Sequence, residues 1–410
     1  MALRLLLGLF TALLLNRVLG EAIASASRGP IGHENALARP ASISTALFAD
    51  LERLSRIVDI SYCVGNTGVR KPFECLSRCS DFPDLSLVTT WNTGVLLSDS
   101  CGYIAVDASS ERERHPGSED SNMTNTSYAS HGTILVAFRG TYSITNTIVD
   151  LSTIPQQYIP YPAPDDGDKG PLKKPKHECA NCTVHMGFLE SWRNARKVIL
   201  PELKALKAKH PSSPIHLVGH SLGGAVACLA ALELKVSLEW DDVRVTTFGE
   251  PRLGNYQLAR FIDKVFGLNE TPTPESWSYR RVTHIDDPVP LLPWDEWGYK
   301  PHAGEVFISK PDLPPSEKDI RSCFGDSDPL CSESSGGSSR QAAPQSTLRE
   351  NHVAAESWQA ESRTFPTRLK LWQLFFAHRD YFWRLGLCVP GGDPADWGRT
   401  ALSSSEPNEL

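Results

Sequence analysis

A serine with glycines two residues to either side is the residue of this chain best suited to nucleophilic chemistry. The run is Ile215-His216-Leu217-Val218-Gly219-His220-Ser221-Leu222-Gly223-Gly224-Ala225, in which an apolar segment precedes Gly-x-Ser-x-Gly and a helical pattern follows it. This is the context of a nucleophile elbow, a strained strand-to-helix turn that lifts the serine hydroxyl above the sheet. The helix N-terminus favours developing negative charge, and the N–H of Leu222 is expected to donate to it. The pattern predicts Ser221 as the nucleophile; the alternative is a chance occurrence of the five residues in a loop.

A serine hydroxyl needs a base, and the base is normally a histidine oriented by a buried carboxylate. In α/β-hydrolases the acid follows the serine along the chain and the histidine comes last. Asp286 and Asp287 follow an apolar segment that reads as a strand, which is where such sites are built. The pattern barely separates the two aspartates, and a role for both as simple loop caps stays open.

Three histidines lie downstream of Asp287, namely His302, His352 and His378. His352 lies beside a stretch rich in Ser, Gly and Gln, and His302 is close in sequence to the acid. His378 lies in Leu374-Phe375-Phe376-Ala377-His378-Arg379-Asp380-Tyr381-Phe382, where aromatic packing would hold an imidazole. A histidine among aromatic residues is also a common structural feature, so the residues alone leave the base open between these candidates.

The elements expected around these residues alternate between strand and helix. Such alternation predicts an α/β fold with a mostly parallel central sheet and helices on both faces. We expect strands at 101–107, 131–138, 215–218, 243–248 and 279–285, and helices at 44–60, 185–209, 222–238 and 253–266.

The N-terminus and the composition indicate export. Residues 1–20 combine Arg4 with an apolar run over 5–15, which predicts a signal peptide rather than the alternative of a membrane anchor. Ten cysteines and four glycosylation sequons fit an oxidising compartment. The formal charge of −7 argues against nucleic acid as a partner. The mature chain is expected to lack a transmembrane segment, and its oligomeric state stays open.

Over residues 45–390 the chain resembles the fungal class 3 triacylglycerol lipases, an extracellular α/β-hydrolase family that also includes feruloyl esterases. The resemblance rests on the elbow and on five further motifs, which are Ser61-Tyr62-Cys63, Phe138-Arg139-Gly140-Thr141, Val184-His185-Met186-Gly187-Phe188, Phe248-Gly249-Glu250-Pro251-Arg252-Leu253-Gly254-Asn255, and Tyr381-Phe382 with Gly386-Leu387-Cys388.

The resemblance implies roles for individual residues. The family's acid directly precedes x-Val-Pro, which corresponds to Asp287, and its histidine precedes a Tyr-Phe pair, which corresponds to His378. Its oxyanion hole combines Thr141 with the backbone N–H of Leu222. The chain departs from the family in having Ala377, where an acidic residue is usual, and a longer gap before His378.

The resemblance also implies disulfides between Cys63 and Cys388, Cys75 and Cys79, and Cys323 and Cys331. Cys179 and Cys182 form an isolated Cys-x-x-Cys without a second pair, which favours a local disulfide over zinc. Cys228 reads as a buried small hydrophobe, and Cys101 has no evident partner. The chemistry needs no metal or cofactor.

Apolar residues at helical spacing follow the predicted oxyanion loop. Ile144, Ile148 and Leu151 fall on one face of the run 142–151, which predicts a short mobile lid over the site. A surface helix fixed on the core is the alternative. The predicted organisation is a signal peptide (1–20), one hydrolase domain (21–395) with a disordered insertion near 332–363, and a polar tail (396–410).

The resulting hypothesis is a secreted serine carboxylic ester hydrolase, in the first place a triacylglycerol lipase acting on lipid at an oil–water interface. A feruloyl or other soluble-ester esterase and a phospholipase A1 are alternatives on the same scaffold. A catalytically inactive binding protein is the alternative from another class.

Overall fold

The computed structural model describes residues 42–94, 96, 98–109, 132–141, 155–159, 178–269, 273–332 and 376–399. All of them belong to one compact unit that spans residues 40–410. The predicted signal peptide, the predicted lid at 142–151 and residues 333–363 of the predicted insertion lie outside the described residues.

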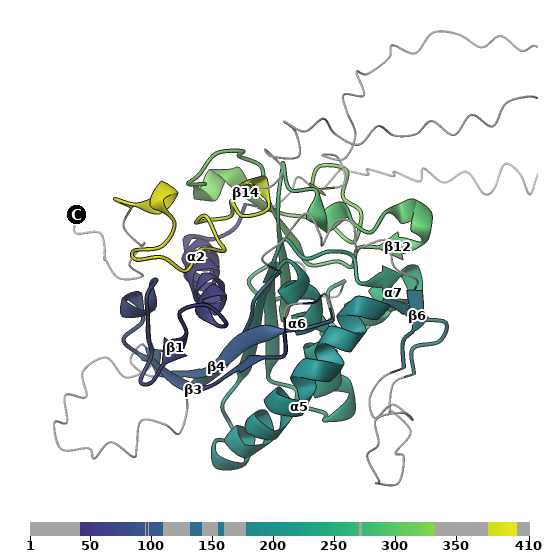
Figure 1. Ribbon diagram of the computed structural model, residues 1–410. Coiled ribbons are helices and arrows are strands. Elements are labelled where there is room, and N and C mark those ends of the chain that lie inside the picture. Colours follow the sequence, from purple (N-terminus) through teal and green to yellow (C-terminus); the bar gives the residue numbers. More distant parts are fainter. Residues whose placement is uncertain are drawn as a thin grey trace, which may run out of the picture. The chain divides into compact units, whose positions relative to one another are not determined.

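An eight-stranded sheet organises the chain (Figure 1). The pairs from β5 through β8, β9 and β11 to β13 are parallel, and the pairs at both edges are antiparallel. The predicted mostly parallel α/β fold is therefore confirmed. In spatial order the strands are β14 (Ile320–Ser322), β13 (Glu305–Ile308), β11 (Tyr279–His284), β9 (Val243–Phe248), β8 (Ile215–His220), β5 (Thr133–Phe138), β4 (Cys101–Asp107) and β3 (Leu85–Asn92).

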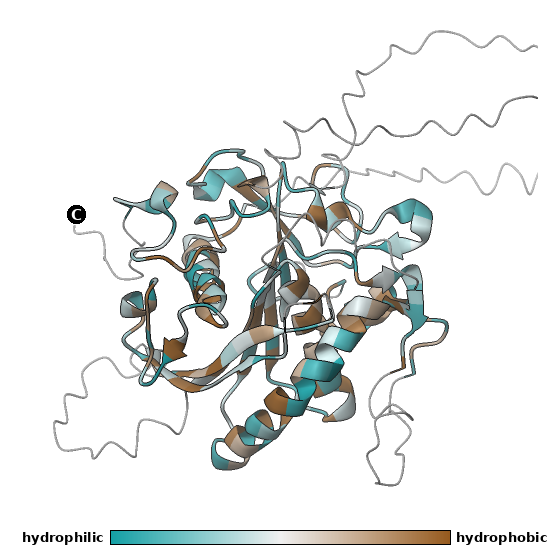
Figure 2. Ribbon diagram, viewed as in Figure 1, coloured by the Kyte–Doolittle hydropathy of each residue, from teal (hydrophilic) through white to brown (hydrophobic). Residues whose placement is uncertain are grey.

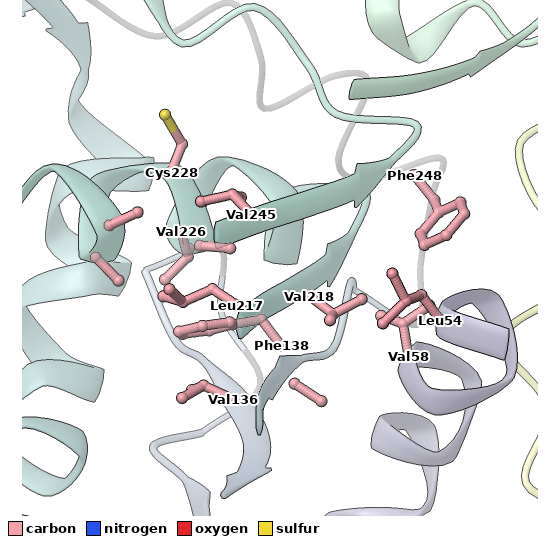
Figure 3. Close-up of a cluster of buried hydrophobic side chains, with 14 of the residues drawn as sticks. Leu54, Val58, Val136, Phe138, Leu217, Val218, Val226, Cys228, Val245 and Phe248 are labelled. Atoms are coloured by element: carbon pink, nitrogen blue, oxygen red, sulfur yellow. The ribbon is translucent and has the colours of Figure 1, made fainter. Parts of the chain in front are cut away.

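Helices cover both faces of this sheet. Helix α2 (Thr45–Ile60) packs on one face, and α6 (Leu222–Leu232), backed by α5 (Met186–Lys209), packs on the other (Figure 1). Successive side chains along the strands point to opposite faces of the sheet, as Figure 3 shows. Val218 and Phe248 lie toward Leu54 and Val58 of α2. Leu217 lies on the opposite side, toward Val226 of α6. Apolar residues run along the strands, whereas α5 mixes hydrophilic and hydrophobic positions because only one side of it is buried (Figure 2).

Two helix boundaries differ from the prediction by more than one residue. Helix α7 (Tyr256–Phe266) begins three residues later than expected because the Asn255 side chain accepts from Leu258 N at 3.1 Å and caps it. Helix α6 ends at Leu232 and continues as a π-helical turn, η4 (Glu233–Ser237). The predicted strand 215–218 extends to His220.

A second, four-stranded sheet was not predicted. Its order is β12 (Tyr299–Lys300), β10 (Gly254–Asn255), β7 (Thr183–His185) and β6 (Pro155–Gln157), and all its pairs are antiparallel. Strands of two or three residues carry too little alternation to be seen in a sequence. A further pair joins β1 (Val69–Arg70) and β2 (Glu74–Cys75).

The cysteines pair as predicted. The disulfides are Cys63–Cys388, Cys75–Cys79, Cys179–Cys182 and Cys323–Cys331, and Cys101 and Cys228 are free and buried. The first of them joins residues 325 apart and ties the C-terminal segment to the end of α2. Packing of that segment continues beyond residue 395, since buried Asp396 pairs with Arg78 at 2.8 Å and with Arg399 at 2.7 Å. Among the helices that the structure describes, none has the length and apolar character needed to cross a bilayer.

Candidate active site

Ser221 lies at the tight turn between β8 and α6. Its backbone has φ 57° and ψ −132°, a strained conformation for a non-glycine residue, and its N–H donates to Phe248 O at 2.9 Å. The flanking glycines are needed for steric reasons: a Cβ at Gly219 would collide with the Gly223 backbone, and a Cβ at Gly223 would lie 2.7 Å from Arg139 O. The local sequence thus produces the elbow that its pattern predicts.

Asp287 and His378 are brought together from positions 91 residues apart. His378 Nδ1 donates to the Asp287 carboxylate, at 3.0 Å from Oδ1 and 2.9 Å from Oδ2. Both side chains are buried, whereas Asp286 is exposed to solvent. Of the two aspartates that the sequence left open, the structure places Asp287 against the histidine.

Tyr381 completes the environment of this carboxylate. Its hydroxyl donates to Asp287 Oδ2, and Val289 N donates to Oδ1 at 2.9 Å. Burial on its own would raise the pKa of Asp287, but the adjacent His378 imidazole and the donors from Tyr381 and Val289 hold that pKa below its ordinary value. The carboxylate is therefore ionised and able to orient the imidazole.

The remaining atoms needed for proton transfer are buried and unengaged. Ser221 Oγ and His378 Nε2 have no hydrogen-bond partner among the described residues. The two residues adjoin each other, because His220, directly before Ser221, donates through Nε2 to His378 O at 2.8 Å. A histidine with Nδ1 on a carboxylate and Nε2 free has the tautomer required of a general base.

Tyr62 connects His220 with the oxyanion loop. Its hydroxyl donates to His220 Nδ1 at 2.5 Å and is also hydrogen bonded to the backbone of Gly140. Burial, reinforced by the nearby His378, lowers the pKa of His220 to about 3, so this ring stays neutral. A role for Tyr62 was missed in the sequence, since its partner is 158 residues away.

The oxyanion loop passes directly over the nucleophile. A Cβ at Gly140 would lie 2.8 Å from Ser221 Cβ and 2.9 Å from His220 O, so only glycine fits there. Thr141 follows this glycine and is half-buried, and Leu222 begins α6 immediately after Ser221. Thr141 therefore directly follows the glycine that packs on Ser221, and Leu222 directly follows Ser221 itself. The predicted lid residues Ile144, Ile148 and Leu151 lie outside the described part of the chain.

Gly249 packs against the acid–base pair from another side. Its φ is 62°, and a Cβ there would lie 2.6 Å from Tyr381 Oη, 2.8 Å from His378 Cε1 and 2.9 Å from Asp287 Oδ2. This explains the glycine in Phe-Gly-Glu-Pro on steric grounds.

Of the other two candidate histidines, His302 belongs to the described residues. His352 lies outside the described residues, and His302 is buried in a separate network with Glu250. Glu250 Oε1 accepts from His302 Nε2 at 3.1 Å, and its Oε2 accepts from Tyr279 Oη at 2.6 Å. Cys228 lies close enough to these side chains for a metal-like group, with ligand atoms within 4.8 Å, but His302 Nδ1 also donates to Ala303 O at 2.7 Å. Both ring nitrogens of His302 therefore lie at hydrogen-bond distance from protein oxygens.

A mostly parallel sheet, a serine elbow after β8 and a buried histidine–carboxylate pair whose Asp287 follows β11 define an α/β-hydrolase with a serine nucleophile. Residues 135–297 match the profile of the family described as lipase (class 3). Secreted mono- and diacylglycerol lipase 2 of Gibberella zeae is 62% identical over 360 residues, covering 88% of this chain and 86% of that protein. Lipase A of Sodiomyces alcalophilus is 59% identical over 372 residues, with coverage of 88% and 86%.

The chain belongs to the class 3 lipase family. Solved structures agree: Lip2 lipase from Yarrowia lipolytica aligns with a TM-score of 0.64 at 27% identity, covering 85% of this chain and 98% of that one. The protein is accordingly a secreted lipase, a serine ester hydrolase whose substrates are lipid esters.

Proposed function

We propose that Ser221, His378 and Asp287 form the catalytic triad of this lipase, and that Thr141 and the N–H of Leu222 bind the oxyanion. The observation that supports it best is the buried His378–Asp287 pair, in which His378 Nε2 has no partner among the described residues. His378 also accepts a hydrogen bond from His220, the residue directly before the strained Ser221. In the first step Ser221 Oγ attacks the ester carbonyl while His378 Nε2 takes its proton. The imidazolium then protonates the leaving alcohol, and water hydrolyses the acyl-enzyme by the reverse roles.

We infer that the substrates are acylglycerols presented at an oil–water interface. Two relatives carry names that bear on the choice among them: the Gibberella zeae protein and a Penicillium cyclopium protein, 30% identical over 231 residues, are named mono- and diacylglycerol lipases. These names support partial glycerides as a second candidate beside triacylglycerols. A panel of triolein, diolein, monoolein, phosphatidylcholine and methyl ferulate distinguishes these from phospholipase and feruloyl esterase activity.

The decisive variant is Ser221→Ala. We expect it to fold normally and to lose turnover on every ester of the panel by a factor on the order of 10⁶, as in other hydrolases that lose their nucleophile. Unchanged thermal unfolding serves as the control for folding. Substantial turnover by the purified variant would contradict the assignment of the nucleophile.

A further inference from the structure

Two tryptophans stand on a fully exposed turn close to the proposed site. The turn is η6 (Asp295–Trp297), none of whose residues is buried. Trp297 is 48% exposed, and Trp294, which precedes the turn, is 39% exposed. A single exposed aromatic residue is ordinary, but two within four residues form a concentrated apolar feature that normally indicates an interaction surface.

The turn is anchored beside the acid–base pair. Arg252 N donates to Leu292 O at 2.7 Å, and its guanidinium donates to Pro293 O at 3.4 Å, immediately before Trp294. Arg252 is three residues from Gly249, which packs against His378, and three residues span at most about 11 Å. The segment that leads into the turn is therefore held near the proposed site.

A third exposed aromatic residue lies at the same end of the small sheet. Strands β10 and β12 are antiparallel, with Asn255 opposite Tyr299. Tyr256 directly follows Asn255, and Trp297 and Gly298 directly precede Tyr299. Tyr256 and the turn therefore lie at the same end of this pair of strands. Tyr256 is 52% exposed. Indole and phenol rings are the side chains that favour the boundary between water and lipid, because each has an apolar body and a polar tip.

The charges around the turn select among lipid surfaces. Asp295 and Glu296 separate the two tryptophans and are exposed, and nearby Lys300 is paired with Asp295 at 2.5 Å. The chain as a whole has a formal charge of −7. An acidic surface of this kind is repelled by anionic bilayers but is compatible with an uncharged oil.

We propose that Trp294, Trp297 and Tyr256, here called the aromatic anchor, bind the surface of uncharged acylglycerol droplets and hold the site at the interface. This rests on the proposed function, in that the droplet is also the substrate. The aromatic anchor is built from described residues and acts independently of the predicted lid.

The test compares W294S/W297S with W397S. Trp397 is 63% exposed but belongs to the C-terminal segment, which Figure 1 shows on the other side of the sheet from β12. Binding to triolein droplets is measured in the Ser221→Ala background, so that hydrolysis does not alter the surface. N-glycans are removed first, because exposed Asn181 of the sequon Asn181-Cys182-Thr183 lies near Asn255.

We expect W294S/W297S to bind droplets roughly a hundredfold more weakly, about tenfold for each tryptophan, and W397S to bind like the parent. In the Ser221-containing enzyme, the ratio of turnover on triolein droplets to turnover on dissolved tributyrin should fall for W294S/W297S only. The parent should bind triolein droplets more tightly than phosphatidylglycerol vesicles.

Unchanged droplet binding by W294S/W297S, an equal loss in W397S, or tighter binding to the anionic vesicles would each overturn the proposal. A parallel loss of turnover on dissolved tributyrin would also overturn it, since the turn would then act on the site itself. Failure of the proposed function is recognised separately, as a parent enzyme that binds droplets but hydrolyses no acylglycerol.

Discussion

The protein contains two buried networks built from the same three side-chain types. In one, Asp287 accepts from the Tyr381 hydroxyl and from His378 Nδ1. In the other, Glu250 accepts from Tyr279 Oη at 2.6 Å and from His302 Nε2 at 3.1 Å. A tyrosine, a carboxylate and a histidine are therefore joined twice, and of these two sets only the first packs beside the elbow serine, Ser221.

The difference between the networks is the second nitrogen of each histidine. His302 Nδ1 donates to Ala303 O at 2.7 Å, so both of its ring nitrogens face acceptors. His378 Nε2 and Ser221 Oγ have no partner among the described residues, and His378 packs on His220, the residue directly before Ser221. A carboxylate-oriented histidine becomes a base only where its other nitrogen is left free, and the closed network serves to hold its elements together.

Removing the two histidines should separate the networks most strongly. We expect His378→Ala to lower kcat by a factor on the order of 10⁶, because the base is lost. His302→Ala should keep kcat within roughly tenfold of the parent but lower the free energy of unfolding by about 2 kcal/mol, since buried Glu250 loses its hydrogen bond to His302. Steady-state kinetics and denaturant unfolding of both variants measure this, and a dead but stable His302→Ala would reverse the comparison.

Substituting the tyrosine of each network, Tyr381 or Tyr279, should give the same contrast in kcat with a smaller effect. Tyr381→Phe removes one donor to Asp287 and should lower kcat about tenfold, from a hydrogen bond to a charged group of about 1.5 kcal/mol. Tyr279→Phe should leave kcat unchanged and reduce only the free energy of unfolding. The kcat values decide the matter: equal losses in the two variants would mean that both carboxylates act on the site.

A further buried carboxylate, Asp59, shows how hydrogen-bond donors affect the pKa of a buried carboxyl group. Asp59 accepts from Gly386 N at 2.7 Å, but its Oδ2 has no hydrogen bond and lies 3.9 Å from Arg78 Nε. Burial raises the pKa of Asp59 to about 7, despite Gly386 and Arg78, whereas the pKa of the well-partnered Asp287 is lowered. Burial raises the pKa of both carboxyl groups; the donors and the imidazole around Asp287 outweigh this effect, whereas Gly386 and Arg78 do not outweigh it at Asp59.

This contrast predicts opposite effects of pH on stability. A folded-state pKa raised from 3.8 to about 7 means that the Asp59 contribution to stability declines as the pH rises through that window. The contribution of Asp287 has the opposite sign and is lost as the pH falls, because its folded-state pKa is lowered. Asp59→Asn should therefore raise Tm at pH 8, by roughly 2–4 °C for each kcal/mol recovered, and change it little at pH 4. An equal shift at both pH values would contradict this account of Asp59.

The parts of the site that could be predicted from the sequence depend either on residues within a short window or on a family motif. The elbow around Ser221 depends on residues within a short window, so its pattern was enough. Choosing Asp287 over Asp286 required the family resemblance, because one residue at a strand end decides between burial and exposure. His378 likewise came from a motif, while its contact with Asp287 spans 91 residues.

What the sequence did not reveal depends on long-range packing. Tyr62 meets His220 across 158 residues, and Tyr381 meets Asp287 across 94. Neither pair leaves a periodic signal, so both tyrosines read only as family markers. The eight-stranded sheet was largely predictable from its long apolar strands, and the four-stranded sheet was not, because its strands have two or three residues.

The central claim is that Ser221 is activated by His378 and not by His302, and the rate of labelling by a fluorophosphonate probe tests it most directly. We expect one label per molecule on Ser221 in the parent and in His302→Ala, with none in Ser221→Ala. His378→Ala should be labelled slower by several orders of magnitude, since nothing removes the serine proton. Mass mapping that places the label on another serine, or rapid labelling of His378→Ala together with loss of labelling in His302→Ala, would contradict the account.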